Sequence, residues 1–139
     1  MNRQYTEGKK FTSFDKSFSS NIIFSEPDKY KLLEEVSYKS DNIINMGSNL
    51  SYSPLSFFKN SLSVNIKNFN RVLEFDRVKK TITVEAGLTL IELLDFTLKH
   101  NLWIPQLPGY PTITIGGAVA ANSHGKSCAT HGTIRKSIK

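Results

Sequence analysis

Apolar and polar residues alternate along this chain in patterns that predict short strands and helices. The first apolar run is 21–24, and Pro27, which follows it, suits the first turn of a helix. We expect this helix to end near Ser37. Its buried face holds three apolar residues, Tyr30, Leu33 and Val36. The run 42–45 predicts another strand, so the chain opens with a strand–helix–strand unit.

The middle of the chain predicts a strand, a hairpin and a helix. Leu62, Val64 and Ile66 would share one face of the strand. Segments 71–76 and 81–85 flank a polar connection, which is the pattern of a hairpin. Thr89 and Glu92 form a capping box at the start of a helix that we expect to fray near residues 100–101. Its buried stripe would hold Leu90, Leu94 and Leu98.

Glycine gathers in one later segment. Five of the eight glycines lie between Gly109 and Gly132. Since glycine allows positive φ and close approach, the run 116–121 is typical of main chain lying against something flat or charged. A tight turn that feeds a buried small-residue helix explains the composition equally well.

Composition limits the class of protein. The 139 residues carry a net charge of +6, but the lysines and arginines are scattered, which favours a solvated surface over a nucleic-acid interface. No apolar run is long enough to span a bilayer, and no signal peptide is evident. The single cysteine, Cys128, excludes an internal disulfide and a cysteine-built zinc site, and the three histidines indicate no metal site. We expect a reducing, cytoplasmic location.

Two loops carry candidate chemistry. Residues 47–51 follow a predicted strand, and their backbone amides and polar side chains could bind an anion such as a diphosphate. By itself this loop is better explained as a serine-rich surface turn. Together with the glycine segment, it could hold one extended cofactor.

A specific resemblance joins the two loops. Pro108–Gly109, Thr114–Asn122 and His124–Lys126 resemble the second FAD-binding segment of the vanillyl-alcohol oxidase/PCMH-type flavoproteins. Met46–Tyr52 falls where that family keeps its pyrophosphate loop. The resemblance covers about residues 20–134, and it is closest to the branch that contains decaprenylphosphoryl-ribose oxidases and aldonolactone oxidases.

The resemblance implies an α+β fold, an FAD-binding PCMH-type domain of two small α/β subdomains with the cofactor between them. Residues 1–19 would be an N-terminal extension and residues 20–139 an incomplete FAD-binding domain, because no strand or helix is evident after residue 134. We therefore expect a truncated polypeptide without the second half of the domain and the cap domain. The parent enzyme would oxidise an alcohol carbon of a sugar, lactone or sugar-lipid by hydride transfer to flavin.

The resemblance also implies a set of contacts. The cofactor-binding residues would be Asn45, Met46, Gly47, Ser48, Asn49, Leu50, Ser51, Tyr52, Gly109, Thr114, Ile115, Gly116, Gly117, Ala121, Asn122 and His124. His124 and Lys126 would also meet the substrate, while the catalytic residues stay unassigned. Leu50 stands where many members attach FAD covalently to a histidine, so we expect non-covalent FAD.

Other functions stay open. A UDP-N-acetylmuramate dehydrogenase-like flavoprotein shares the first loop type, although residues 110–115 lengthen the second loop here. A non-catalytic remnant or a basic binding module is the other alternative. We expect a small-molecule sugar or lactone substrate, no nucleic-acid partner and no transmembrane segment, with the oligomeric state undetermined.

Overall fold

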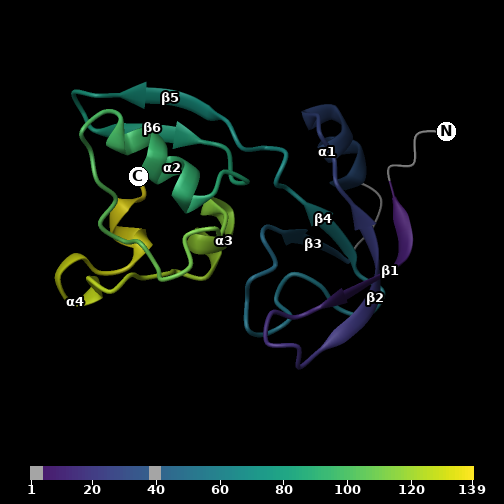
Figure 1. The fold of residues 1–139 in the computed structure, drawn as a ribbon. Coiled ribbons are helices and arrows are strands. Elements are labelled where there is room, and N and C mark those ends of the chain that lie inside the picture. Colours follow the sequence, from purple (N-terminus) through teal and green to yellow (C-terminus); the bar gives the residue numbers. More distant parts are fainter. Residues whose placement is uncertain (1–4, 38–41) are drawn as a thin grey trace. The chain divides into compact units, whose positions relative to one another are not determined.

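The chain folds as two compact units. The computed structural model describes residues 5–37 and 42–139, and contacts divide it into Met1–Phe69 (unit 1) and Asn70–Lys139 (unit 2) (Figure 1). Each unit contains both strands and helices. The expected α+β class is therefore confirmed.

Unit 1 is built on a four-stranded sheet. Its order is β1 (Thr6–Thr12), β2 (Ser19–Ser25), β4 (Leu62–Asn65) and β3 (Ile43–Met46). β2 and β3 both run parallel to β4, whereas β1 pairs antiparallel to β2. The sequence did not predict β1, because its residues are almost all polar and exposed.

Helix α1 (Tyr30–Ser37) packs against this sheet and forms one of its two cores (Figure 1). Val36 is fully buried and Leu33 packs beside it, as expected. Tyr30 is instead 54% exposed, and its ring stacks on Phe69 with ring centroids 5.2 Å apart.

The second core of unit 1 explains why β4 is buried throughout. Ile22, Phe24, Met46 and Phe57 form this cluster, separate from the one that contains Leu62 and Val64. The predicted strand and the shared face of Leu62 and Val64 are confirmed, and the structure adds that all four residues of β4 are buried. β4 lies between two other strands and has no exposed face, while Ile66 lies beyond its end and is half-buried.

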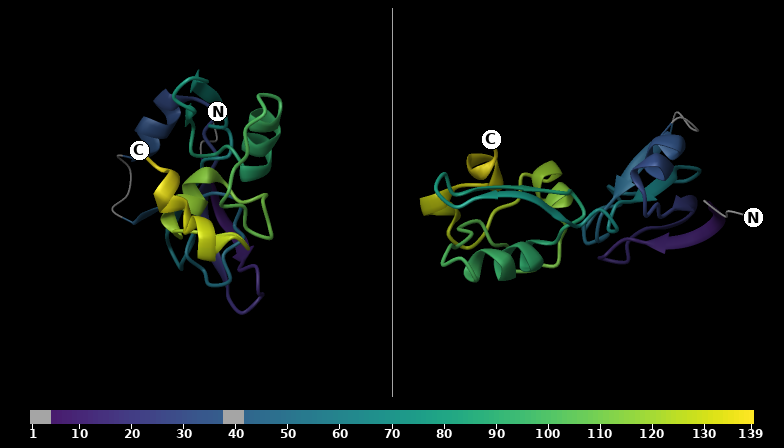
Figure 2. Two further views of the ribbon diagram at one scale, coloured as in Figure 1. Left: turned by 90° about the vertical axis from the view of Figure 1, so that its left-hand side faces the viewer. Right: turned by 90° about the horizontal axis from the view of Figure 1, so that it is seen from above.

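Unit 2 begins with the predicted hairpin. β5 (Val72–Asp76) pairs antiparallel with β6 (Thr81–Val84). Helix α2 (Leu90–Leu98) follows, and the capping box is confirmed: the Thr89 N–H donates to Glu92 Oε2 at 2.8 Å, and the Glu92 N–H donates to Thr89 Oγ1 at 3.3 Å. Figure 2 shows these elements from two further sides.

The buried stripe of α2 differs from the prediction. Leu90, Leu93 and Thr97 are buried, whereas Leu98 is 47% exposed. The stripe advances by three and then four residues, so it stays nearer one side of the helix than the four-residue steps that we expected. Leu90 packs with Ala118 and Ile134.

The glycine segment feeds a short helix, α3 (Ile115–Ala120), followed by α4 (Cys128–His131) and the 3-10 helix η1 (Ile134–Ser137). In α3 only Ala118 is buried, while Gly117, Val119 and Ala120 are exposed, so the expected small-residue helix exists but is not buried as a whole. No helix in the described residues is long and apolar enough to cross a membrane.

Candidate functional site

The first candidate loop, 47–52, leaves the sheet at the carboxyl end of β3. Asn49 lies at a φ of 54°, a left-handed conformation that asparagine tolerates better than most residues. Its side-chain amide donates to the Thr12 carbonyl at 3.2 Å, and its Oδ1 accepts from Ser56 Oγ at 3.0 Å. Asn49 therefore fixes the shape of the loop through its side chain.

Free backbone donors remain in this loop. Among the described residues, the N–H groups of Gly47, Leu50 and Ser51 donate no hydrogen bond, and all three residues are half-buried. Backbone N–H groups strongly require partners when they lose water. Several such groups in one turn are suited to binding an anion.

The side chains around the loop differ in their accessibility. Asn45 is exposed at the end of β3, and Ser48 is half-buried. Met46 is 1% exposed and lies in the core, so its side chain cannot reach a ligand on the surface. Tyr52 is 74% exposed and makes an edge-to-face contact with Phe14, with centroids 5.7 Å apart.

The second candidate segment uses its backbone donors internally. The Ile115 N–H donates to Leu88 O at 2.7 Å, and the Gly116 N–H donates to Ala86 O at 2.8 Å. Gly117 N–H donates to the hydroxyl of Thr114, which is 1% exposed. The start of α3 therefore has no spare donors at these three positions, and any ligand contact there would be made by other atoms.

Two glycines in this segment have opposite surroundings. A Cβ on Gly125 would lie 2.3 Å from Leu107 O and 2.8 Å from Leu107 C, so the two backbones are in direct contact. A Cβ on Gly109 would meet nothing within 4 Å, and Gly109 is exposed. Packing requires the glycine at 125, whereas neither packing nor a positive φ explains it at 109.

Residues 121–126 form an exposed turn with a fixed backbone. The Ser123 N–H donates to Ala118 O at 2.9 Å, and Ser123 O accepts from the Ile134 N–H at 2.8 Å. Ala121, Asn122, His124 and Lys126 are all exposed. His124 Nδ1 lies 3.4 Å from the Gly125 carbonyl oxygen, and its backbone bridges Thr133. Four expected residues of this turn, Ala121, Asn122, His124 and Lys126, are thus accessible to a ligand.

The sequence analysis missed a buried residue that bonds to α4 and η1, which follow this turn. Gln106 is 3% exposed, its Nε2 donates to His131 O at 3.0 Å, and its Oε1 accepts from Ser137 Oγ at 2.8 Å. Ser127 Oγ adds a bond to Pro105 O at 2.6 Å. A lone polar residue inside the apolar stretch 102–107 was the available signal.

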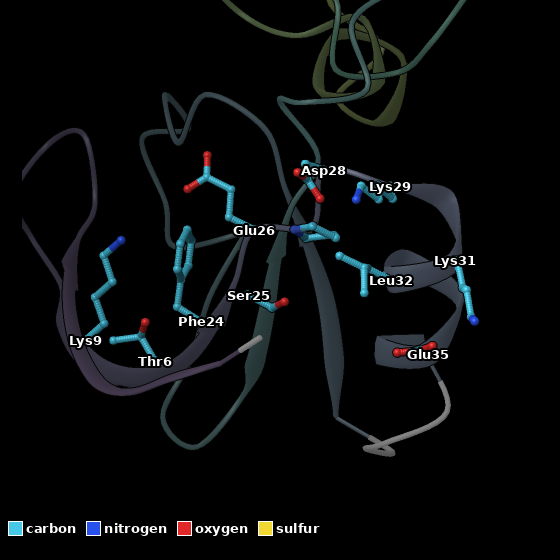
Figure 3. A pocket seen from close by; sticks show the side chains of 11 residues that line it. Thr6, Lys9, Phe24, Ser25, Glu26, Asp28, Lys29, Lys31, Leu32 and Glu35 are labelled. Carbon is cyan, nitrogen blue, oxygen red and sulfur yellow. The ribbon is translucent and has the colours of Figure 1, made fainter. Parts of the chain in front are cut away.

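A cavity of about 810 Å³ lies elsewhere, in unit 1 (Figure 3). It is lined by Thr6, Lys9, Phe24, Ser25, Glu26, Pro27, Asp28, Lys29, Lys31, Leu32 and Glu35. None of these residues belongs to the expected site. Lysines and carboxylates are equally numerous in the lining, and Lys9 Nζ is already placed over the Phe24 ring at 3.7 Å. The cavity therefore does not select one sign of charge.

Metal chemistry has no support in the described residues, where no group of three or more His, Cys, Asp or Glu side chains could hold a metal ion. Cys128 is a free, half-buried thiol.

Several curated proteins are similar in sequence to part of this chain. The chain is 30% identical over 97 residues to a decaprenylphosphoryl-beta-D-ribose oxidase of Mycolicibacterium smegmatis, an alignment that covers 70% of the chain and 21% of the oxidase. It is 36% identical over 61 residues to an L-gulonolactone oxidase of Mus musculus, covering 44% of the chain and 14% of that enzyme. The chain thus spans about a fifth or less of the length of these relatives.

The fold has a counterpart in a solved structure. Alkyldihydroxyacetonephosphate synthase matches with a TM-score of 0.73 and 21% identity, over 97% of this chain and 29% of the synthase. The sequence profile of a family described as "FAD binding domain" matches residues 26–139. These matches confirm the resemblance seen in the sequence and support FAD as the cofactor. The chain belongs to the FAD binding domain family.

Proposed function

We propose that this chain binds FAD non-covalently through the loop 47–52 and the segment 109–124, as part of an oxidoreductase that acts on an alcohol carbon of a sugar, lactone or sugar-lipid. The family match over residues 26–139 carries this proposal. The names of the relatives, a decaprenylphosphoryl-ribose oxidase and an L-gulonolactone oxidase, support the substrate class.

The loop 47–52 fits a diphosphate. Gly47, Leu50 and Ser51 each have an N–H group without an acceptor among the described residues. The side chain of Asn49 holds the loop in place, so the amides are arranged before a ligand arrives. Preorganised donors cost less entropy on binding than donors that must first be ordered.

The segment 109–124 would contact FAD by close packing and by exposed polar side chains. The N–H groups of Ile115, Gly116 and Gly117 are already bonded within the chain. The start of α3 would therefore contact FAD through van der Waals packing and not through these N–H groups. The open space beside Gly109 is where a side chain would obstruct a close ligand. The exposed Asn122 and His124 can then supply polar contacts.

The proposed chemistry follows from the cofactor and from the residues near it. FAD supplies hydride acceptance when bound, while the protein supplies binding and orientation. The Leu50 side chain has no nucleophilic atom, so it cannot form a covalent bond to FAD. His124 and Lys126 are exposed and can meet a substrate hydroxyl or an anionic group.

A titration tests this function. Purified chain is titrated with FAD, ADP and riboflavin, with flavin fluorescence and calorimetry as readouts. We expect saturable binding of FAD and ADP, and much weaker binding of riboflavin, which lacks the diphosphate. Binding of riboflavin as tight as that of FAD would contradict the role of the loop 47–52. Salt-sensitive nucleic-acid binding without any flavin binding would instead favour the basic module.

A further inference from the structure

The first hairpin of unit 1 lies outside the family match. The match begins at residue 26, whereas β1 ends at Thr12 and β2 ends at Ser25. Residues 13–18 join these two strands and form the turn of the hairpin. The hairpin contains none of the expected FAD contacts, but its turn contacts the loop 47–52.

One hydrogen bond joins the end of β1 to the middle of the loop 47–52. The side-chain amide of Asn49 donates to the Thr12 carbonyl at 3.2 Å. Asn49 comes directly before Leu50 and Ser51, whose N–H groups donate no hydrogen bond among the described residues. The position of the hairpin therefore bears directly on where these two N–H groups lie.

A single carboxylate fixes the shape of the turn. Asp15 Oδ1 accepts hydrogen bonds from Ser13 Oγ at 2.6 Å, from Ser17 Oγ at 2.8 Å and from the Ser17 N–H at 3.1 Å. Inside this ring of bonds, Lys16 takes a φ of 62°, and its N–H donates to Ser13 O at 2.9 Å. Asp15 itself is exposed, so its side chain serves the turn and not the core.

Aromatic contacts hold the hairpin on both sides of this turn. The rings of Phe11 and Phe18 lie 6.0 and 5.9 Å from the ring of Phe57, which is fully buried. Between them, Phe14 makes its edge-to-face contact with Tyr52. Because the strands are anchored to the core, a change in the shape of the turn cannot be absorbed by moving the whole hairpin.

We propose that the turn 13–18 positions the diphosphate loop, with Asp15 setting the shape of the turn and Asn49 transmitting it to the N–H groups of Leu50 and Ser51. This inference rests on the proposed function. Asp15 and the side chain of Asn49 are positioning groups, which raise affinity without touching the ligand. They do so because donors that are already in place lose less entropy when the ligand binds.

Geometry and charge predict opposite effects at Asp15. The diphosphate of FAD is anionic, so by electrostatics alone the removal of a carboxylate would leave affinity unchanged or raise it. Loss of the acceptor that shapes the turn should instead lower affinity. Asp15→Ala removes the charge and the acceptor, whereas Asp15→Asn removes only the charge, since asparagine keeps an oxygen that accepts bonds in the same kind of turn.

The second hairpin supplies a matched control. Asp76 lies at the end of β5 in unit 2, and its Oδ1 accepts from the N–H groups of Val78 at 3.0 Å and of Lys79 at 2.9 Å. Asp76→Ala thus removes a carboxylate that shapes a hairpin turn, as Asp15→Ala does. A general effect of lost charge or of a loosened turn would appear in both variants.

The experiment measures the Kd of FAD and of ADP by calorimetry, well below the thermal midpoint of each variant. We expect Asp15→Ala and Asn49→Gly each to raise both Kd values about five- to tenfold, the effect of about one hydrogen bond. Glycine adopts the φ of 54° at position 49 freely, so Asn49→Gly removes the side chain without straining the backbone. Asp15→Asn and Asp76→Ala should stay within about twofold of wild type.

A double variant tests the transmission through Asn49. Once the bond to Thr12 is gone, the shape of the turn should no longer reach the loop. We therefore expect Asp15→Ala combined with Asn49→Gly to bind FAD within about twofold of Asn49→Gly alone, because effects on one shared path do not add. In the cofactor-free chain, Asp15→Ala should also shift the NMR amide signals of Leu50 and Ser51, and Asp76→Ala should not.

Each other result overturns the inference. An unchanged Kd in Asp15→Ala, an equal loss in Asp76→Ala, unmoved amide signals of Leu50 and Ser51, or losses that multiply in the double variant refute the positioning role. A Kd as high in Asp15→Asn as in Asp15→Ala assigns the effect to charge and also refutes it. In all these cases FAD binding by wild type keeps the proposed function intact. Absence of FAD binding by the wild-type chain refutes the proposed function, and this inference with it.

Discussion

Gly125→Ala is predicted to be among the most damaging small substitutions in unit 2. The added Cβ would lie 2.3 Å from Leu107 O and 2.9 Å from Leu107 N. The shortest of these distances is about 1 Å less than the 3.4 Å at which ordinary contact begins, and both atoms belong to the backbone, which cannot rotate away. The two segments must therefore separate. We expect a loss of about 3 kcal/mol in the free energy of unfolding, the upper part of the range for overpacking.

The assay is urea unfolding followed by the fluorescence of Trp103, the single tryptophan, which lies in unit 2. Gly109→Ala is the control, because its Cβ would meet no atom within 4 Å. We expect the control to stay within about 0.5 kcal/mol of wild type. Equal unfolding free energies for Gly125→Ala and Gly109→Ala would refute the argument from the Leu107 contact.

Three further predictions concern other parts of the chain. Thr89→Ala removes the cap of α2 and should cost about 1 kcal/mol, measured by the same urea assay. Phe57→Ala empties a fully buried position in unit 1 and should cost about 3–5 kcal/mol, measured by circular dichroism, and a loss below about 1 kcal/mol would argue against the described core. Hydrogen bonds from Ser13 Oγ and from Ser17 hold the pKa of Asp15 below its ordinary 3.8. A carboxyl with a lowered pKa contributes stability that is present above pH 3.8 and is lost as the pH falls through the lowered pKa. The unfolding free energies of wild type and Asp15→Asn should therefore converge in acid. A difference between the two free energies that stays constant down to pH ~2 would contradict this.

Local patterns in the sequence predicted much of the fold. The hairpin 72–84 and the capping box at Thr89 are each formed by residues close together in the sequence, so a short stretch of sequence is enough to predict them. β1 could not be found in this way, since its polar residues are held by pairing with β2. The burial of β4 on both faces likewise depends on Phe57 and α1, which lie elsewhere in the sequence.

The sequence predicted the two segments of the candidate site, but it did not predict which of their backbone N–H groups are already hydrogen-bonded within the fold. Glycines and small residues marked 109–125 as a segment of turns with a small-residue helix, and the structure places α3 there and Gly125 against Leu107. Sequence alone did not show that the amides of Ile115 and Gly116 are already bonded to Leu88 and Ala86, because those partners come from a preceding loop. The one sequence signal for Gln106, a polar residue inside the apolar stretch 102–107, did not show that its side chain bonds His131 and Ser137.

The most direct test of the account is to follow the backbone amides by NMR while FAD is added to isotope-labelled chain. We predict that the amide signals of Gly47, Leu50 and Ser51 move most, because these groups gain acceptors from the diphosphate. We also predict that Ile115 and Gly116 keep slow hydrogen exchange, because their internal bonds persist. Saturating FAD that leaves Gly47, Leu50 and Ser51 unmoved, or that shifts only residues lining the cavity of unit 1, would contradict the assignment of the diphosphate to the loop 47–52.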